Sequence, residues 1–335
     1  MLVRELNTAL HHFLETDPRV VVMGEDIADP YGGAFKVTRG LTTAFPDRVL
    51  TTPVSEAGMV GVAAGLAMSG YRPIVEIMFG DFVTLAFDQI VNHVAKYPAM
   101  YGGRVTCPVI VRVPSGGHRG YGPTHSQSLE KHFLGVPGLM VVAASPFHDP
   151  ADVLGALLQR DEPVIYVEHK LLYAEPILRP QGGRIGEAIG REGGSPDALP
   201  TVTLSFVDRS ECAATVLAYG YTALLAMRAI EALAIEEEVF AELVVPAQLA
   251  PMDWGPVLES VDRTGSLVTV EEGMAGWSWG TQAAADVGAL RFGRLRRPVT
   301  VTASGPGVIP SSRSLEREVL VGVDQIRDAV REACR

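Results

Sequence analysis

Four side chains that could carry acid–base or stacking chemistry each follow a short apolar run of the sequence. They are Glu25, Glu56, Phe82 and His125. Neighbouring carboxyl groups can hold and exchange a proton, an imidazole can act as a general acid or base near neutral pH, and an aromatic ring can stack on a planar ligand. This chemistry requires a fold that brings the four residues together.

Each of these residues alone also has a purely structural interpretation. Glu56 could be a first-turn glutamate on the surface of a helix capped by Ser55, because a negative charge there complements the helix dipole. Phe82 could be an ordinary core residue, Glu25 a solvated loop charge, and the glycine-rich stretch around His125 a surface loop. Position along the chain does not decide between the interpretations.

The elements that must position these residues follow from the alternation of apolar runs with helical stretches, which predicts an α/β fold with parallel sheets covered by helices. Ligands of such sheets bind beyond the carboxyl ends of the strands, so the four side chains are expected to converge at one edge. The strands predicted in the first half are 20–23, 49–52, 73–78, 109–113, 140–143 and 164–167.

A stretch rich in glycine and proline interrupts this pattern and predicts a connector at 176–200, between domains at 1–175 and 201–335. The alternation then resumes. Strands are predicted at 215–219, 242–245, 267–270 and 299–302, and helices at 222–237, 257–261 and 324–333.

Composition excludes several classes of function. The chain has 28 Lys and Arg against 39 Asp and Glu, and a net charge of −11 disfavours binding to nucleic acid or to anionic lipid. The apolar stretch 57–70 is too short and too rich in glycine to cross a bilayer, and no export signal is recognisable. The three cysteines have no metal-binding spacing, which favours a reducing cytoplasm.

Several sequence motifs together resemble one known family. In order along the chain they are MGED at 23–26, YGGAFKVTRGL at 31–41, TPVSEAG at 52–58, RPIVEIMFGDF at 72–82, DQIVNH at 88–93, HSQS at 125–128 and PGLMVV at 137–142. The chain resembles the β subunit of the thiamine-diphosphate-dependent component of 2-oxoacid dehydrogenase complexes. The resemblance implies two open, mainly parallel sheets, in a pyrimidine-binding domain followed by a transketolase C-terminal-like domain.

The same resemblance assigns roles to individual residues. Glu56 matches the glutamate that bonds N1′ of the cofactor's aminopyrimidine, and Phe82 matches the ring that stacks on it. His125 matches an active-site histidine, Glu25 an acidic residue near the cofactor, and Val54 a further cofactor contact. The first half therefore resembles an aminopyrimidine half-site.

The diphosphate half is expected on another chain. The wider family holds the diphosphate through Mg²⁺ with a GDG segment, which this sequence lacks. The resemblance therefore implies an α subunit that brings thiamine diphosphate and Mg²⁺ in an α₂β₂ heterotetramer. It also implies a small 2-oxoacid substrate and, as a further partner, a lipoyl acyltransferase.

The second half departs from the usual pattern at 244–253, 276–280 and 304–316, which leaves the acyl acceptor open. His118, Arg119 and Tyr121 could contribute to acceptor specificity or simply face solvent. Two alternatives therefore remain at this point: a subunit of a split transketolase-like carboligase, and a non-catalytic α/β regulatory subunit.

Overall fold

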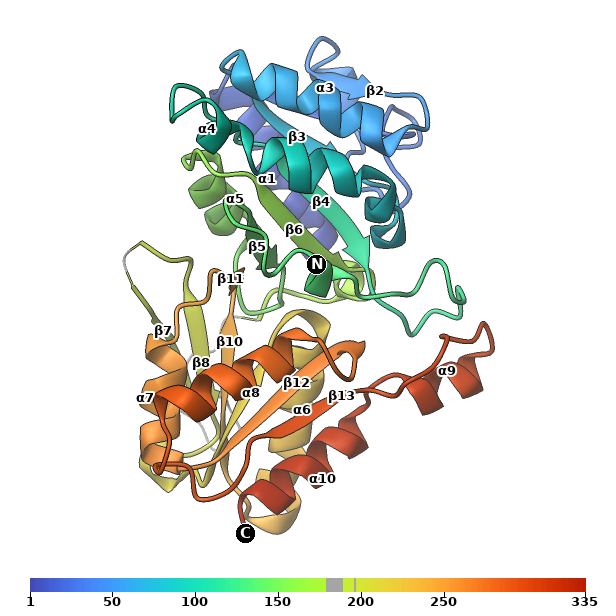
Figure 1. Cartoon of the computed structure of the whole chain (residues 1–335). Coiled ribbons are helices and arrows are strands. Elements are labelled where there is room, and N and C mark those ends of the chain that lie inside the picture. Colours follow the sequence, from blue (N-terminus) through green and yellow to red (C-terminus); the bar gives the residue numbers. More distant parts are fainter. Residues whose placement is uncertain (179–188, 196) are drawn as a thin grey trace.

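The computed structural model describes residues 1–178, 189–195 and 197–335, which form two sheets flanked by helices (Figure 1). The first sheet has the strand order β11-β5-β6-β4-β3-β1-β2 and is parallel except for β11. Its strands are β1 (Val20–Gly24), β2 (Val49–Thr51), β3 (Arg72–Glu76), β4 (Ile110–Ser115), β5 (Met140–Ala143), β6 (Val164–His169) and β11 (Gln248–Ala250).

Helices cover both faces of this sheet because successive residues of its strands point to opposite sides. On one face Ile74 packs with α1 and α5, and on the other Val75 packs with α3. The helices of this half are α1 (Leu2–Thr16), α2 (Leu41–Ala44), α3 (Glu56–Met68), α4 (Tyr97–Met100) and α5 (Pro150–Leu158). Short 3₁₀ or π segments occur at η1 (Gly80–Ala86), η2 (Gln89–Val94), η3 (Glu130–His132) and η4 (Leu172–Ala174).

The second sheet has the order β13-β12-β9-β10-β8-β7, in which β8 and β7 run antiparallel to their neighbours. Its strands are β7 (Ile189–Gly193), β8 (Thr201–Ser205), β9 (Ala214–Ala218), β10 (Ala241–Pro246), β12 (Leu267–Met274) and β13 (Thr300–Ser304). The helical segments of this half are η5 (Arg209–Glu211), α6 (Gly220–Glu237), α7 (Gly255–Thr264), α8 (Trp279–Leu290), α9 (Arg313–Val319) and α10 (Val323–Ala333). The predicted α/β class with two mainly parallel sheets is confirmed.

The two halves share apolar packing. One hydrophobic cluster contains Met59 and Val111 of the first half together with Leu217 and Trp279 of the second. Strand β11, from the second half, also adds to the edge of the first sheet beside β5. These contacts pack the second half of the chain against the first.

Most predicted strands are present within one or two residues of their expected bounds. Strands β7, β8 and β11 and helices α2, α4 and α9 were not predicted. The predicted connector contains β7, whose backbone pairs with β8, while residues 179–188 and 196 lie outside the described residues. The domain bounds stay a prediction.

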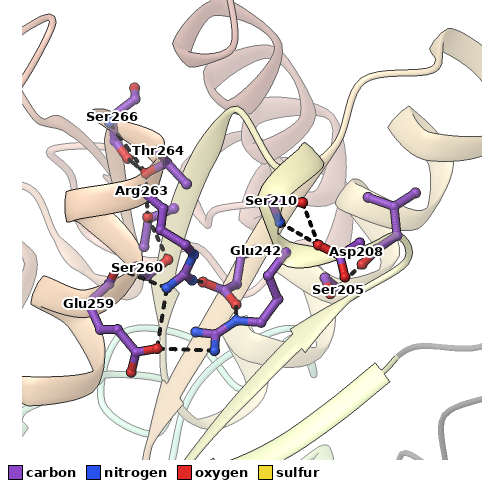
Figure 2. Close-up of polar contacts among 12 residues, drawn as sticks. Ser205, Asp208, Ser210, Glu242, Glu259, Ser260, Arg263, Thr264 and Ser266 are labelled. Carbon is purple, nitrogen blue, oxygen red and sulfur yellow. Dashed lines mark hydrogen bonds and ion pairs between the residues drawn. The ribbon is translucent and has the colours of Figure 1, made fainter.

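A paired ionic cluster supports the second sheet far along the chain from the four candidate residues. The buried carboxylate of Glu242, on β10, accepts hydrogen bonds from Arg209 and Arg263 (Figure 2).

Among the described residues, no helix has the length and apolar character needed to cross a membrane.

Candidate active site

Two carboxyl groups are buried together at the carboxyl edge of the first sheet. Glu25 directly follows β1, and Glu56 is the first residue of α3, which begins after β2. Burial raises the pKa of Glu25, and the nearby charge of Glu56 raises it further, although the Ser55 backbone N–H donates to Glu25 and opposes the shift. One oxygen of Glu25 has no hydrogen-bond partner in the described structure.

The surface interpretation of Glu56 is wrong. Ser55 occupies the N-cap position of α3, but its side chain makes no capping bond, and the Glu56 side chain is only 4% exposed. Val54, in contrast, is 81% exposed, so its contact with a cofactor stays a prediction.

An aromatic cluster surrounds His125 at the same edge. The imidazole centroid lies 4.8 Å from the ring of Phe79 and 5.2 Å from that of Phe82, both edge to face. Gly80, which lies between the two phenylalanines, packs closely against Ser115. A Cβ at position 80 would lie 2.1 Å from the Ser115 hydroxyl oxygen, so the close approach requires glycine. The structure therefore brings Phe82 and His125 together, as the sequence predicts.

The two pairs of residues are linked only indirectly. Phe35 lies in the loop after Glu25, and its ring is 5.5 Å from that of Phe79. Within the described residues, no hydrogen bond or ring contact joins Glu56 to His125. The carboxyl pair and the aromatic pair therefore form adjacent parts of one edge.

Lys170 is a site residue that sequence reasoning missed. Its buried ammonium donates a 2.8 Å hydrogen bond to the backbone oxygen of His125. Burial lowers its pKa to about 8, although the charge of Asp81 favours the protonated form. The available signal was the polar run Glu168-His169-Lys170 at the end of a strongly apolar strand.

A carboxylate of the second half holds the glycine-rich loop that carries His125. One oxygen of Glu272 accepts the Gly117 backbone N–H at 2.7 Å and the Ser128 hydroxyl at 3.2 Å. Its other oxygen lies 2.9 Å from Nε2 of His169 and 3.4 Å from Nε2 of His118. The two halves are thus joined by hydrogen bonds at the loop.

The charges within this cluster follow from its hydrogen bonds. Nδ1 of His169 accepts the Leu171 amide, so Nε2 carries the proton donated to Glu272, while burial lowers the pKa of His169. Burial also opposes protonation of His118, but Glu272 outweighs it and raises the pKa of His118. Despite burial, His169 and His118 hold the pKa of Glu272 well below its usual range.

A fully paired network lies inside the sheet beneath this edge. The buried Arg112 guanidinium donates to Glu76 at 2.6 Å and to both oxygens of Glu168 at 2.7 Å. The Tyr173 hydroxyl also donates to Glu168. The network joins β3, β4 and β6 where their ends approach the site.

One further motif in the second half has the spacing of an esterase nucleophile, G-x-S-x-G, at 276–280 between β12 and α8. The Ser278 hydroxyl is buried and donates to Glu271 at 2.5 Å. No histidine hydrogen-bonds to it within the described residues, so its geometry is that of a structural serine.

Comparison with known proteins gives two family matches that together span most of the chain. Residues 3–176 match the transketolase pyrimidine-binding domain, and residues 206–326 match the transketolase C-terminal domain. The solved "Split gene transketolase, inactive beta4 tetramer" has a TM-score of 0.72, covers 99% of this chain and 98% of its own, and is 20% identical, which shows the fold.

Several curated relatives match over nearly the full length. The pyruvate dehydrogenase E1 component subunit beta of Leifsonia xyli is 39% identical, over 98% of this chain and 93% of the relative. The acetoin:2,6-dichlorophenolindophenol oxidoreductase subunit beta of Cupriavidus necator is 35% identical, over 98% and 96%. The 3-methyl-2-oxobutanoate dehydrogenase subunit beta of Mycobacterium tuberculosis is 33% identical, over 100% and 92%.

These matches agree with the resemblance drawn from the motifs, and the family is dependent on thiamine diphosphate. The chain belongs to the family of β subunits of thiamine-diphosphate-dependent, 2-oxoacid-dehydrogenase-like E1 components, within the transketolase-like proteins.

Proposed function

We propose that this chain supplies the aminopyrimidine half of the active site of a thiamine-diphosphate-dependent 2-oxoacid dehydrogenase. The observation that carries the proposal is the buried pair of carboxyl groups, Glu25 and Glu56. An oxygen of Glu25 lacks a partner, and buried polar atoms are normally satisfied by hydrogen bonds. An aminopyrimidine offers a basic ring nitrogen and an amino group, so the residues fit this cofactor.

When bound, thiamine diphosphate supplies the electron sink for decarboxylation of a 2-oxoacid. In this assignment Glu56 holds the proton at N1′ of the pyrimidine, and Glu25 places a second carboxyl group beside it. The ring of Phe82 stacks on the pyrimidine. The contribution of these residues is to bind the cofactor and keep its ring in one protonation state.

His125 is assigned to proton transfer at the substrate. Its Nδ1 lies 3.0 Å from the Thr124 hydroxyl, which leaves Nε2 for a substrate or acceptor atom. Phe79 and Phe82 pack against the imidazole and limit access of water to it. Lys170 fixes the backbone at the same residue.

The other half of the site is assigned to an α subunit in an α₂β₂ heterotetramer, which brings Mg²⁺ and the diphosphate contacts. The relatives are named as β subunits, which implies such a partner. Two relatives are named for 2-oxoacids, pyruvate and 3-methyl-2-oxobutanoate, and support this substrate class. The acyl group then passes to a lipoyl acyltransferase or to a specialised acceptor.

The test is CO₂ release from a panel of 2-oxoacids by the chain reconstituted with its α partner, with ferricyanide as electron acceptor. Acetoin, whose cleavage releases no CO₂, is tested separately by the reduction of ferricyanide. Glu56→Gln should lower the rate by about 10²- to 10⁴-fold, because an amide cannot donate the N1′ proton in the same way. Glu15→Gln, at an exposed position of α1, should leave it unchanged. Near-normal turnover by Glu56→Gln would refute the assignment.

A further inference from the structure

The guanidinium of Arg119 lies beside the His125 cluster without a counter-ion. Its Cζ atom is 5.1 Å from the ring centroid of Tyr121 and 5.9 Å from that of Phe35. Among the described residues no hydrogen bond or ion pair involves this side chain. Its five N–H donors are therefore available, and its charge lies over two aromatic rings.

A shortage of acidic groups does not explain this isolation. The chain has 39 Asp and Glu against 28 Lys and Arg, and its buried or half-buried arginines are generally paired. Arg112 faces two carboxylates, and both Arg209 and Arg263 face Glu242 (Figure 2). Arg119 therefore has no ion-pair partner because of its position in the structure, not because acidic residues are scarce.

Arg119 shares its aromatic neighbours with the proposed catalytic histidine. The ring of Tyr121 is 6.2 Å from that of Phe79, and Phe79 is in turn 4.8 Å from His125. Phe35 also contacts Phe79, from the loop that follows Glu25. The unpaired guanidinium therefore lies at the rim of the aromatic cluster that contains His125.

The loop holds Arg119 in a defined place. The Gly117 backbone N–H donates to Glu272 at 2.7 Å, and the Gly120 N–H donates to Glu316 at 2.9 Å. Both acceptors come from the second half of the chain, and they fix the backbone on either side of Arg119. A preorganised arginine loses less conformational entropy when it binds an anion.

Arginine rather than lysine is suited to the carboxylate of a 2-oxoacid because its planar fork can donate two parallel hydrogen bonds. Lys170, the other cation nearby, already donates to the His125 backbone oxygen and faces the charge of Asp81. We propose that Arg119 is a substrate-binding residue that receives the carboxylate of the 2-oxoacid beside His125. This inference rests on the proposed function and adds the group that selects the anionic substrate.

The experiment compares two probes that differ in charge but hardly in shape, pyruvate and its neutral analogue pyruvamide. Saturation-transfer NMR on the purified full chain measures their binding without requiring turnover. The wild type should bind pyruvate at least about tenfold more tightly than pyruvamide, the lower limit for a hydrogen bond to a charged group. Arg119→Met should abolish this preference while binding of pyruvamide stays the same.

Two further variants control the experiment. Arg119→Lys keeps the charge but not the fork, and should retain part of the preference for pyruvate. Arg48→Met removes an arginine that likewise stacks on a ring, Phe45, away from the site, and should behave as wild type. Equal melting temperatures of the variants would show that the fold is intact.

Three outcomes would overturn the proposal: a wild-type chain that does not distinguish the two probes, Arg119→Met that still does, or Arg119→Met that binds pyruvate normally but fails to assemble with the α partner. The last would assign the guanidinium to a carboxylate of that partner. The proposed function is judged separately by CO₂ release. Charge-selective binding through Arg119 without CO₂ release would support the binding site and refute the dehydrogenase.

Discussion

Two polar regions of the first half differ in whether their charged groups have hydrogen-bond or ion-pair partners. Inside the sheet, the guanidinium of Arg112 meets the carboxylates of Glu76 and Glu168. At the carboxyl edge of the same sheet, Glu25 and Asp81 each have an oxygen without a partner, and the guanidinium of Arg119 has no described counter-ion. Groups with a partner and groups without one are therefore only a few residues apart in the sequence.

The presence or absence of a partner distinguishes groups that stabilise the fold from groups that are available to bind a ligand or a partner chain. An unpaired buried polar group costs stability in the free chain, so a folded protein rarely keeps several at one place without a functional reason. A carboxyl group at a strand end whose pKa is raised, as that of Glu25 is, is accordingly a candidate for function. Substitution in the two regions should therefore have opposite effects on stability.

The largest effect is expected inside the sheet. Arg112→Met should lower the free energy of unfolding by about 3–5 kcal/mol, because it leaves the carboxylates of Glu76 and Glu168 buried without a cation. Denaturation by urea measures the loss. The exposed pair of Arg19 and Asp17 provides the control, and Arg19→Met should cost no more than about 1 kcal/mol. Similar losses at both positions would contradict the distinction.

An intermediate effect is expected at the contact between the halves. Glu272→Gln can still accept the Gly117 and Ser128 donors, but it loses the charge that faces His118 and His169, and should cost about 1–3 kcal/mol. The pKa of His118 is raised in the folded state, so its stabilising contribution is present below the unfolded pKa and is lost as pH rises through the folded value. The cost should be larger at acid than at alkaline pH.

Urea denaturation at pH 5.5 and pH 8 tests this dependence. In a His118→Gln background, the cost of Glu272→Gln should depend less on pH, because burial lowers the pKa of His169 and so favours its neutral form. A pH-independent cost in the wild-type background would show that His118 does not contribute through its charge.

The sequence predicts the parts of the fold that depend on local pattern. Strand β5 occupies the predicted residues 140–143 because an apolar run buried on both faces has few alternatives. Strand β11 was missed because it has three residues and forms by pairing with β5, more than a hundred positions earlier. The glycines near β7 likewise predict a connector, and only its partner β8 makes it a strand.

The candidate site follows the same division. The edge at which Glu25 and Glu56 meet follows from parallel topology alone, since both residues come after strands that end at that edge. The contact of Glu272 with Gly117 joins residues 155 positions apart and has no local signature. The isolation of Arg119 is equally invisible in the sequence, because it depends on whether an ion-pair partner lies within reach in space.

The smallest expected effect has the opposite sign and provides the sharpest test of the comparison. Glu25→Gln should stabilise the free chain near pH 8 by a modest amount, within the roughly 0.5–2 kcal/mol typical of stabilising substitutions. The reason is that burial and the charge of Glu56 raise the pKa of Glu25, so that ionisation is less favourable in the folded chain than in the unfolded one.

The sign of the pH dependence follows from linkage. A carboxyl group whose folded pKa is raised contributes its stability below the unfolded pKa and loses it as pH rises through the folded value. The advantage of Glu25→Gln should therefore grow from about pH 4 upward, whereas Glu15→Gln, at an exposed position of α1, should show no such growth. Thermal denaturation of the free chain across this range measures both. A loss of stability in Glu25→Gln would place Glu25 among the groups that hold the fold, and would remove the main support for the carboxyl pair as a ligand site.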